Sequence, residues 1–121
     1  MKFQHAQLAA GRWAAMSLCE QMANVGSEVE RAIARRNKGD RSNSEAAFYR
    51  ALELLDLTIR FSRGFCRRRE LARTRELLTD HFAFDNEYDT SDHYWQELFR
   101  HFTWAAAMQR RRPESGQTER G

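Results

Sequence analysis

The stretch AFYRALELLDLTI (residues 47–59) is the most apolar helical segment of the chain and decides its fold class. Its apolar residues recur every three or four positions, which is the spacing of one helix face and not of a strand. The main stripe consists of Phe48, Leu52, Leu55 and Ile59. Ala47, Ala51, Leu54 and Thr58 widen this stripe, and Leu57 and Phe61 widen it further. A helix with so broad an apolar surface is expected to pack against neighbours on two sides.

The same periodicity predicts three more helices around this one. The four expected helices cover about 13–36, 43–62, 67–82 and 91–112. Ser42 and Glu45 predict a capping box at the start of the second helix, and Thr90 or Ser91 is expected to cap the fourth. No strand-like alternation and no internal repeat is visible. The sequence therefore predicts an all-α fold, an antiparallel up-down four-helix bundle with short loops.

A chain of 121 residues has the length of one domain, which we place at residues 1–112. The tail 113–121, PESGQTERG, contains no apolar residue and is expected to be disordered. No apolar run is long enough to span a bilayer. Two cysteines, Cys19 and Cys66, are too few for a disulfide framework. These features predict a cytoplasmic protein with no membrane partner.

Charge is divided between two consecutive segments. Residues 60–75 contain seven arginines and one acid, whereas residues 76–99 contain seven acids and no lysine or arginine. A uniformly basic surface would favour nucleic acid as the partner. This divided pattern fits self-association or intramolecular pairing equally well.

Four segments of the chain support a family resemblance. They are EQMANVGSEVERAI (20–33), AFYRALELLDLTI (47–59), RRELARTRELLTDHF (68–82) and NEYDTSDHYWQELFRHF (86–102). They resemble a family of small bacterial helical-bundle proteins whose function is uncharacterised. The resemblance implies one intact helical domain and implies no activity. This chain reads FSRGFC (61–66) where that family has a turn of the Asp-Pro-Lys kind. More loosely, the four-helix layout is similar to the HEPN superfamily of nucleotide- and RNA-associated bundles.

The looser resemblance supplies one candidate catalytic pair, Arg75 and His81. HEPN ribonucleases carry an Arg and a His on one helix, where His acts as acid or base and Arg stabilises phosphate charge. Arg75 also lies beside the apolar line of its predicted helix, where a charge needs an acidic partner. Glu28, Asp56 and the loop acid Glu87 are the candidates for that partner. The structural alternative, an ion pair that fixes helix packing, is the favoured interpretation of Arg75. Binding of an anionic ligand by Arg75 is the other alternative.

Two sets of polar residues are candidates for binding. On the first helix, Gln21, Asn24 and Glu28 form a polar stripe with Arg31 and Arg35, which is either a groove wall or a solvated face with i,i+3 and i,i+4 pairs. The second set, Arg67, Arg68 and Arg73 with Arg69, is suited to phosphate binding. The alternative interpretation of these arginines is that they only cover the exposed start of a helix, where cations oppose the helix dipole.

Metal and cofactor motifs are incomplete or absent. Asp85, Glu87 and Asp89 alternate like the opening of a calcium loop, but Thr90 and Gln96 occupy the positions that need Gly and a bidentate acid. We expect no cofactor and no bound metal ion.

Surplus apolar residues predict self-association as a homodimer. Leu54, Leu57 and Phe61, together with Trp104 and Met108, lie off the main stripes of their helices, as does Trp13. The sequence thus predicts a non-enzymatic helical interaction or binding module, with itself or another protein as partner. The alternatives are a HEPN-like RNA-processing or nucleotide-associated protein, and RNA binding through the arginine cluster.

Overall fold

The computed structural model describes residues 11–111, and this part of the chain is all-α, as the sequence predicts. The long helices are α2 (Leu18–Asn37), α3 (Arg41–Phe61), α4 (Phe65–Ala83) and α5 (Asp92–Arg111), and a short helical segment at 11–15 precedes them. Residues 1–10 and 112–121, which include the predicted tail, lie outside the described residues.

The first predicted helix is interrupted before α2 begins. Ser17 takes an extended conformation and forms a capping box with Glu20, in which the Ser17 hydroxyl accepts from the Glu20 N–H and the Ser17 N–H donates to Glu20 Oε1. The segment before this cap folds onto α3, because Trp13 Nε1 donates to Thr58 Oγ1 over 3.0 Å. Trp13 is buried, so the expectation that it forms part of an exposed apolar surface is wrong.

The caps of α3 and α5 differ in how well the sequence predicts them. Asp40, not Ser42, caps α3 by accepting from the backbone N–H of Asn43. The side-chain amide of Asn43 and this N–H hold the pKa of Asp40 below its usual value. Ser91 caps α5 by accepting from the Tyr94 N–H, which leaves the Thr90 side chain free for other contacts.

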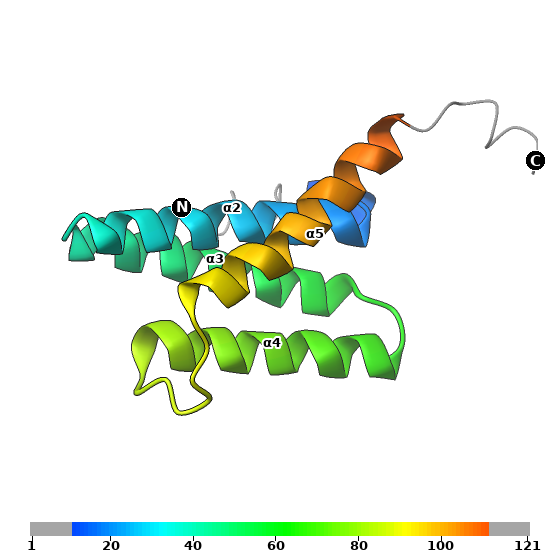
Figure 1. Ribbon diagram of the computed structural model, residues 1–121. Helices are drawn as coiled ribbons and strands as arrows, with labels where there is room; N and C mark the ends of the chain where they lie inside the picture. Colours follow the sequence, from blue (N-terminus) through cyan, green and yellow to red (C-terminus); the bar gives the residue numbers. More distant parts are fainter. Residues whose placement is uncertain (1–10, 112–121) are drawn as a thin grey trace, which may run out of the picture.

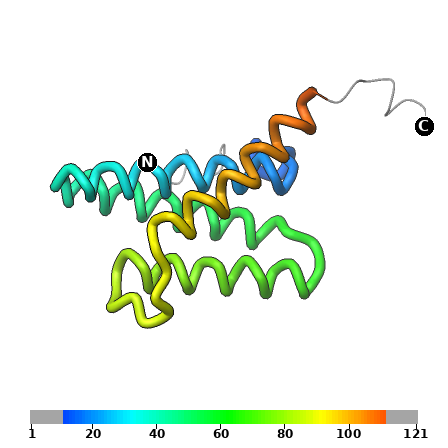
Figure 2. Tube along the Cα trace, in the orientation of Figure 1, coloured from blue at the N-terminus to red at the C-terminus, as the bar shows by residue number. Residues whose placement is uncertain are grey.

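Helix α2 is the centre of the arrangement (Figure 1). It packs most extensively against α3, with which it forms an antiparallel pair, and next against α5, while α4 packs against α3. Helices α4 and α5 make almost no contact along their lengths. The trace in Figure 2 shows them joined at one end by the 84–91 loop and diverging from there.

The core lies between α2 and α3 and extends onto α4 and α5. Leu55 of the opening stretch is fully buried, as are Val25, Leu78 and Trp95 from the other three helices. Ser44 is also buried, and its hydroxyl is satisfied by the Ala32 carbonyl of α2 at 2.8 Å. Every helix therefore contributes to one common core.

Contact between α2 and α5 requires the absence of a side chain at Gly26. A Cβ at this position would lie 2.6 Å from Phe99 Cβ and 2.8 Å from Phe99 Cγ. Real Cβ atoms do not approach so closely, and the clash is with the root of the Phe99 side chain, which cannot move without its helix. Gly26 thus sets how closely α5 packs on α2.

We expect Gly26→Ala to lower the free energy of unfolding by about 1–3 kcal/mol, because overpacking forces α5 away from α2. This loss occurs although alanine favours an isolated helix by roughly 1 kcal/mol over glycine. Urea denaturation followed by far-UV circular dichroism measures it. Ser27→Ala, at the exposed neighbouring position of the same helix, is the matched control and should change little. A Gly26→Ala variant as stable as the parent would contradict the packing described here.

Candidate functional site

A polar junction joins the ends of three helices beside the 84–91 loop. It consists of Arg36 from the end of α2, His81 from α4, Thr90 from the loop and Asp92 from the start of α5. The Arg36 guanidinium donates to the Asp92 carboxylate and lies over the ring of Phe82, 5.2 Å from its centroid. His81 Nε2 donates to Asp92 Oδ1 over 3.0 Å. The Asp92 carboxylate is therefore shared by two helices other than its own.

Hydrogen bonds extend this junction into the loop. Thr90 Oγ1 lies 2.9 Å from His81 Nδ1 and accepts from Trp95 Nε1 over 3.2 Å. The Asn86 side chain forms two hydrogen bonds with the Thr90 backbone. Its Nδ2 donates to the Thr90 carbonyl, and its Oδ1 accepts from the Thr90 N–H. Asp80, buried at the end of α4, accepts from the N–H groups of the first two residues after Asn86. These bonds hold the loop to both helices that it connects.

The Asp92 carboxylate is held in its ionised form. Partial burial acts to raise its pKa, but hydrogen bonds from Arg36 and His81 and the Arg36 charge outweigh burial and lower the pKa below the ordinary value of 3.8. The junction is therefore a charged contact that ties the start of α5 to α2 and α4.

The two predicted catalytic residues are not brought to one site. The His81 side chain is only 6% exposed, and both of its ring nitrogens have partners in the junction. Arg75 Nε instead donates to Asp56 Oδ1 of α3 over 2.7 Å. Asp56 is one of the three acids named from the sequence as its partner. The Arg75 side chain is 37% exposed, so this is a surface pair and not a buried charge.

Most of the predicted binding residues of α2 form hydrogen bonds or ion pairs with other residues of α2. Gln21 is buried, and its amide donates to the Trp13 carbonyl over 2.8 Å. Asn24 donates to the Glu20 carbonyl one turn earlier, and Glu28 pairs with Arg31 over 2.7 Å. This is the i,i+3 and i,i+4 pattern of a solvated helix face rather than a groove wall.

The arginine cluster remains on the surface. Arg67, Arg68 and Arg73 are exposed, and none of them forms an ion pair within residues 11–111. The N-cap of α4, Gly64, provides no side-chain hydrogen bond, and the first turn of α4 contains no acid. Positive charge thus accumulates at an uncapped helix start, where the dipole is also positive.

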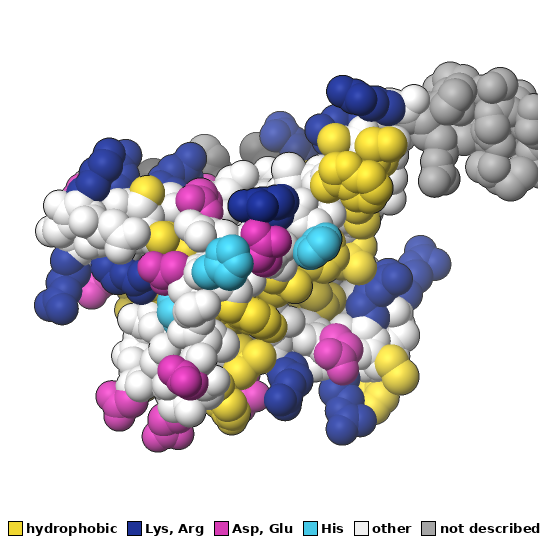
Figure 3. Space-filling view, in the orientation of Figure 1, with side chains coloured by type: hydrophobic (Ala, Val, Ile, Leu, Met, Phe, Trp, Pro, Cys, Tyr) yellow, Lys and Arg dark blue, Asp and Glu magenta, His cyan; other side chains and the backbone are white. Residues whose placement is uncertain are grey.

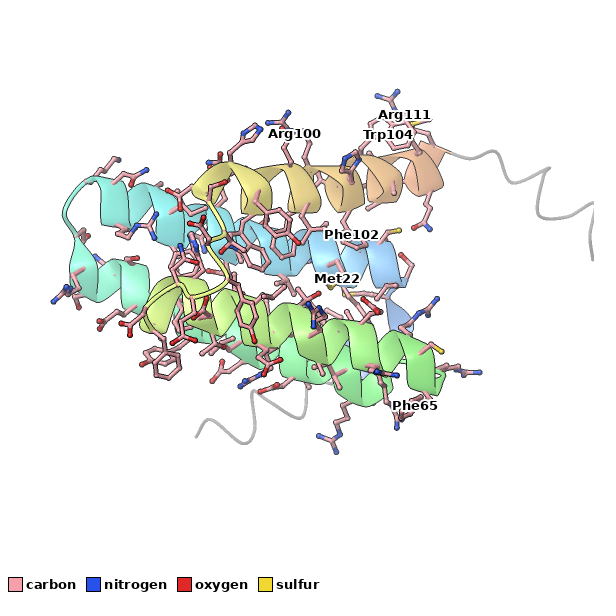
Figure 4. All side chains as sticks on the ribbon, turned by 60° about the horizontal axis from the view of Figure 1, so that its bottom comes forward. Met22, Phe65, Arg100, Phe102, Trp104 and Arg111 are labelled. Atoms are coloured by element: carbon pink, nitrogen blue, oxygen red, sulfur yellow. The ribbon has the colours of Figure 1, made fainter. Side chains whose placement is uncertain are left out.

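Apolar side chains are left half-covered where α4 and α5 diverge, and we call this surface the apolar recess. Figure 3 shows a continuous apolar band here, and Figure 4 shows Phe102 and Met22 directed into the space between the two helices. Leu98 lies one turn before Phe102 on α5, and Leu77 lies one turn before His81, whose ring faces the start of α5. Leu77, Leu98 and Phe102 are only partly buried.

The predicted interface residues fall into two groups. Leu54 and Leu57 are half-buried against the core of their own chain. Phe61 is exposed by about a third, with the Arg60 guanidinium over its ring. Trp104 and Met108 are exposed on α5. Leu54 and Leu57 therefore belong to the core of their own chain, whereas Phe61, Trp104 and Met108 are available for contact with another molecule.

Comparisons with known proteins identify no relative. No protein-family model matches the chain, and no curated protein and no solved structure matches it significantly. Within the described part of the chain, no group of three or more His, Cys, Asp or Glu side chains is arranged to hold a metal ion. No helix there is both long and apolar enough to cross a membrane.

Sequence reasoning missed the polar junction and the exposed aromatic residues around α4, whereas it did single out Phe61 and Trp104. Arg36 and Asp92 are 56 residues apart in the sequence, and no local pattern links them. Phe65, Phe84 and Tyr88 are exposed aromatic side chains around α4. The exposure of Phe65 could have been predicted from the sequence. Phe65 lies at the start of its helix and is not on the helix face that carries the buried Leu71 and Leu78.

We expect Asp92→Asn to lower the free energy of unfolding at pH 7 by about 1–3 kcal/mol, because it removes the charge that two hydrogen bonds stabilise. The folded-state pKa of Asp92 is lowered, so its contribution is present above the ordinary pKa of 3.8 and is lost as the pH falls through the folded-state pKa. The difference between variant and parent should therefore shrink below about pH 4. Urea denaturation at pH 7 and at low pH measures it.

Asp89→Asn removes the same charge from the exposed loop and is the matched control. Its backbone is in the left-handed region, which Asn tolerates. Equal pH profiles for the two variants would contradict the role assigned to Asp92.

Proposed function

We propose that the protein is a non-enzymatic interaction module, an antiparallel up-down four-helix unit that is open along one side. The observation that carries this proposal is the apolar recess between α4 and α5. Helices α4 and α5 flank this surface, and Figure 4 shows the buried Met22 of α2 between them. An amphipathic helix can place its apolar face along an apolar strip of this kind. The proposed partner is the apolar face of one such helix.

The charges around the recess favour an acidic partner helix. The recess opens toward the start of α4 and the end of α5, because the 84–91 loop joins their other ends (Figure 1). The first turn of α4 contains Arg67 and Arg68, and the last turn of α5 contains Arg110 and Arg111. Figure 3 shows basic side chains on both sides of the open end. Acidic residues flanking the partner's apolar stripe would be attracted to this rim.

The alternatives have weaker support. A HEPN-like activity needs Arg75 and His81 at one site, but each is held by a different partner. RNA binding is supported only by the exposed arginines at the start of α4. Binding of single-stranded RNA with a steep salt dependence, abolished by Arg67→Glu with Arg68→Glu, would favour that alternative.

Self-association is a second part of the proposal. The opposed charges of residues 60–99 and the exposed aromatic side chains Phe65, Phe84 and Tyr88 around α4 support it. A soluble monomer rarely leaves large apolar patches uncovered, which is the physical reason to expect a homodimer.

We expect the protein to bind a designed amphipathic peptide with a leucine stripe and glutamates on its other faces. Binding should be weakened about tenfold or more by Phe102→Asp, which places a charge in the recess. Trp104→Asp, which puts the same charge on an exposed side of α5, is the matched control and should bind like the parent. Fluorescence anisotropy of the labelled peptide measures affinity, and circular dichroism checks that each variant is folded.

Further measurements show whether binding takes place at the recess. A peptide with lysine in place of glutamate should bind more weakly, and the amide resonances of Leu77, Leu98 and Phe102 should shift on titration. The recess is not the binding surface if the glutamate and lysine peptides bind alike, or if Phe102→Asp and Trp104→Asp have equal effects.

A further inference from the structure

The outward face of α4 carries a second surface, which we call the outer seam. Its residues are spaced by alternating steps of four and three: Phe65, Arg69, Ala72, Glu76, Thr79 and Ala83. This is the spacing of the a and d positions in a coiled coil. Thr79 is half-buried, and the other five are exposed. α4 packs on α3 through a different stripe that includes Leu71 and Leu78, so the outer seam has no partner within residues 11–111.

Exposed aromatic rings lie at both ends of the outer seam. Phe65 at the start of α4 is 76% exposed, and Figure 4 shows it on the side of α4 that faces away from α5. Phe84 and Tyr88, just past the end of α4, are 71% and 55% exposed. They border a hollow of about 600 Å³ that Ala72 and Thr79 of the seam also line.

Charge along α4 is distributed against the helix dipole. Four arginines and one acid lie in the first half of the helix, whereas the second half holds Arg75, Glu76 and Asp80 and the loop that follows adds three more acids. In an isolated helix this order is unfavourable at both ends. Two such helices side by side and antiparallel would place each basic half next to an acidic half, whereas a parallel pair would place like charges together.

We infer that the outer seam binds the outer seam of a second copy of this chain, antiparallel and across a two-fold axis. This inference rests on the self-association proposed above and is independent of the apolar recess. The occupant is a second copy because each seam supplies both the basic and the acidic half that the other needs. A two-fold axis requires such self-complementarity, since the same surface serves both subunits.

The register follows from the spacing. With Ala72 opposite Glu76 of the second copy, Arg69 lies opposite Thr79 and one turn from Glu76, within reach of an ion pair. Phe65 then lies opposite Ala83, about 27 Å along the helix from its own copy's Ala83. Its ring enters the hollow bordered by Phe84 and Tyr88 of the second copy. The small side chain of Ala72 near the axis lets the two helices approach closely.

A charge exchange tests this register. Arg69→Glu and Glu76→Arg, each alone, place like charges together twice across the two-fold axis and should weaken the dimer about tenfold or more. The double variant Arg69→Glu with Glu76→Arg restores opposite charges and should recover most of the parent's association. Neither residue forms an ion pair within the described chain, so the single variants should remain folded. Arg69→Glu even favours the dipole of its own helix.

Sedimentation equilibrium at micromolar concentration gives the mass relative to the 14.3 kDa monomer. Trp104→Glu is the control on α5 and should leave the dimer intact. A monomeric parent overturns both self-association and this surface. A dimer that resists both single exchanges, or that fails to recover in the double variant, overturns the outer seam alone. A dimer broken by Trp104→Glu and not by Arg69→Glu would place the interface on α5 instead.

Discussion

The close approach of α5 to α2 at Gly26 is the constraint on which the rest of the arrangement depends. Because no side chain occupies this point, Phe99 packs directly on the α2 backbone and the ring of Trp95 is fully buried one turn earlier. Helix α5 therefore packs against α2 and not against α4. Since α4 packs on α3, the two outer helices are held by different members of the central pair and separate as they leave their common loop.

The polar junction fixes the point from which they separate. Asp92 is bonded by Arg36 of α2 and by His81 of α4, so the start of α5 is tied to both helices at once. Thr90 satisfies the second nitrogen of His81 and the indole N–H of Trp95. Polar groups in a partly buried site are stabilising only when their partners are present, and here the partners come from four segments of the chain. The junction has a structural role, which leaves His81 without a free nitrogen for chemistry.

Two separate surfaces follow from this geometry, and they differ in chemistry. The apolar recess exists because α4 and α5 diverge, and it offers half-buried aliphatic and aromatic side chains with a basic rim. The outer seam exists because α4 uses only one stripe to contact the core, and it combines charge pairs with exposed aromatic rings at its ends. The recess is the surface proposed for a partner helix, and the outer seam is the surface proposed for a second copy of the chain.

The sequence by itself determined the helices and most of the core, because the period of apolar residues is a local property of each segment. Phe48, Leu52 and Leu55 were identified in this way and are buried. Asp56 was among the three acids predicted as partners of Arg75, and it forms that pair. The break at Ser17 was missed although the Ser17–Glu20 capping box is a local signal. The burial of Trp13 was not predictable in this way, since it depends on contact with α3, more than forty residues away. Only the tertiary structure decided that α5 packs on α2, that Arg36 and His81 share Asp92, and which apolar residues stay exposed. These outcomes depend on how closely two helices can approach, and that distance is set by pairs of residues such as Gly26 and Phe99 that no local pattern connects.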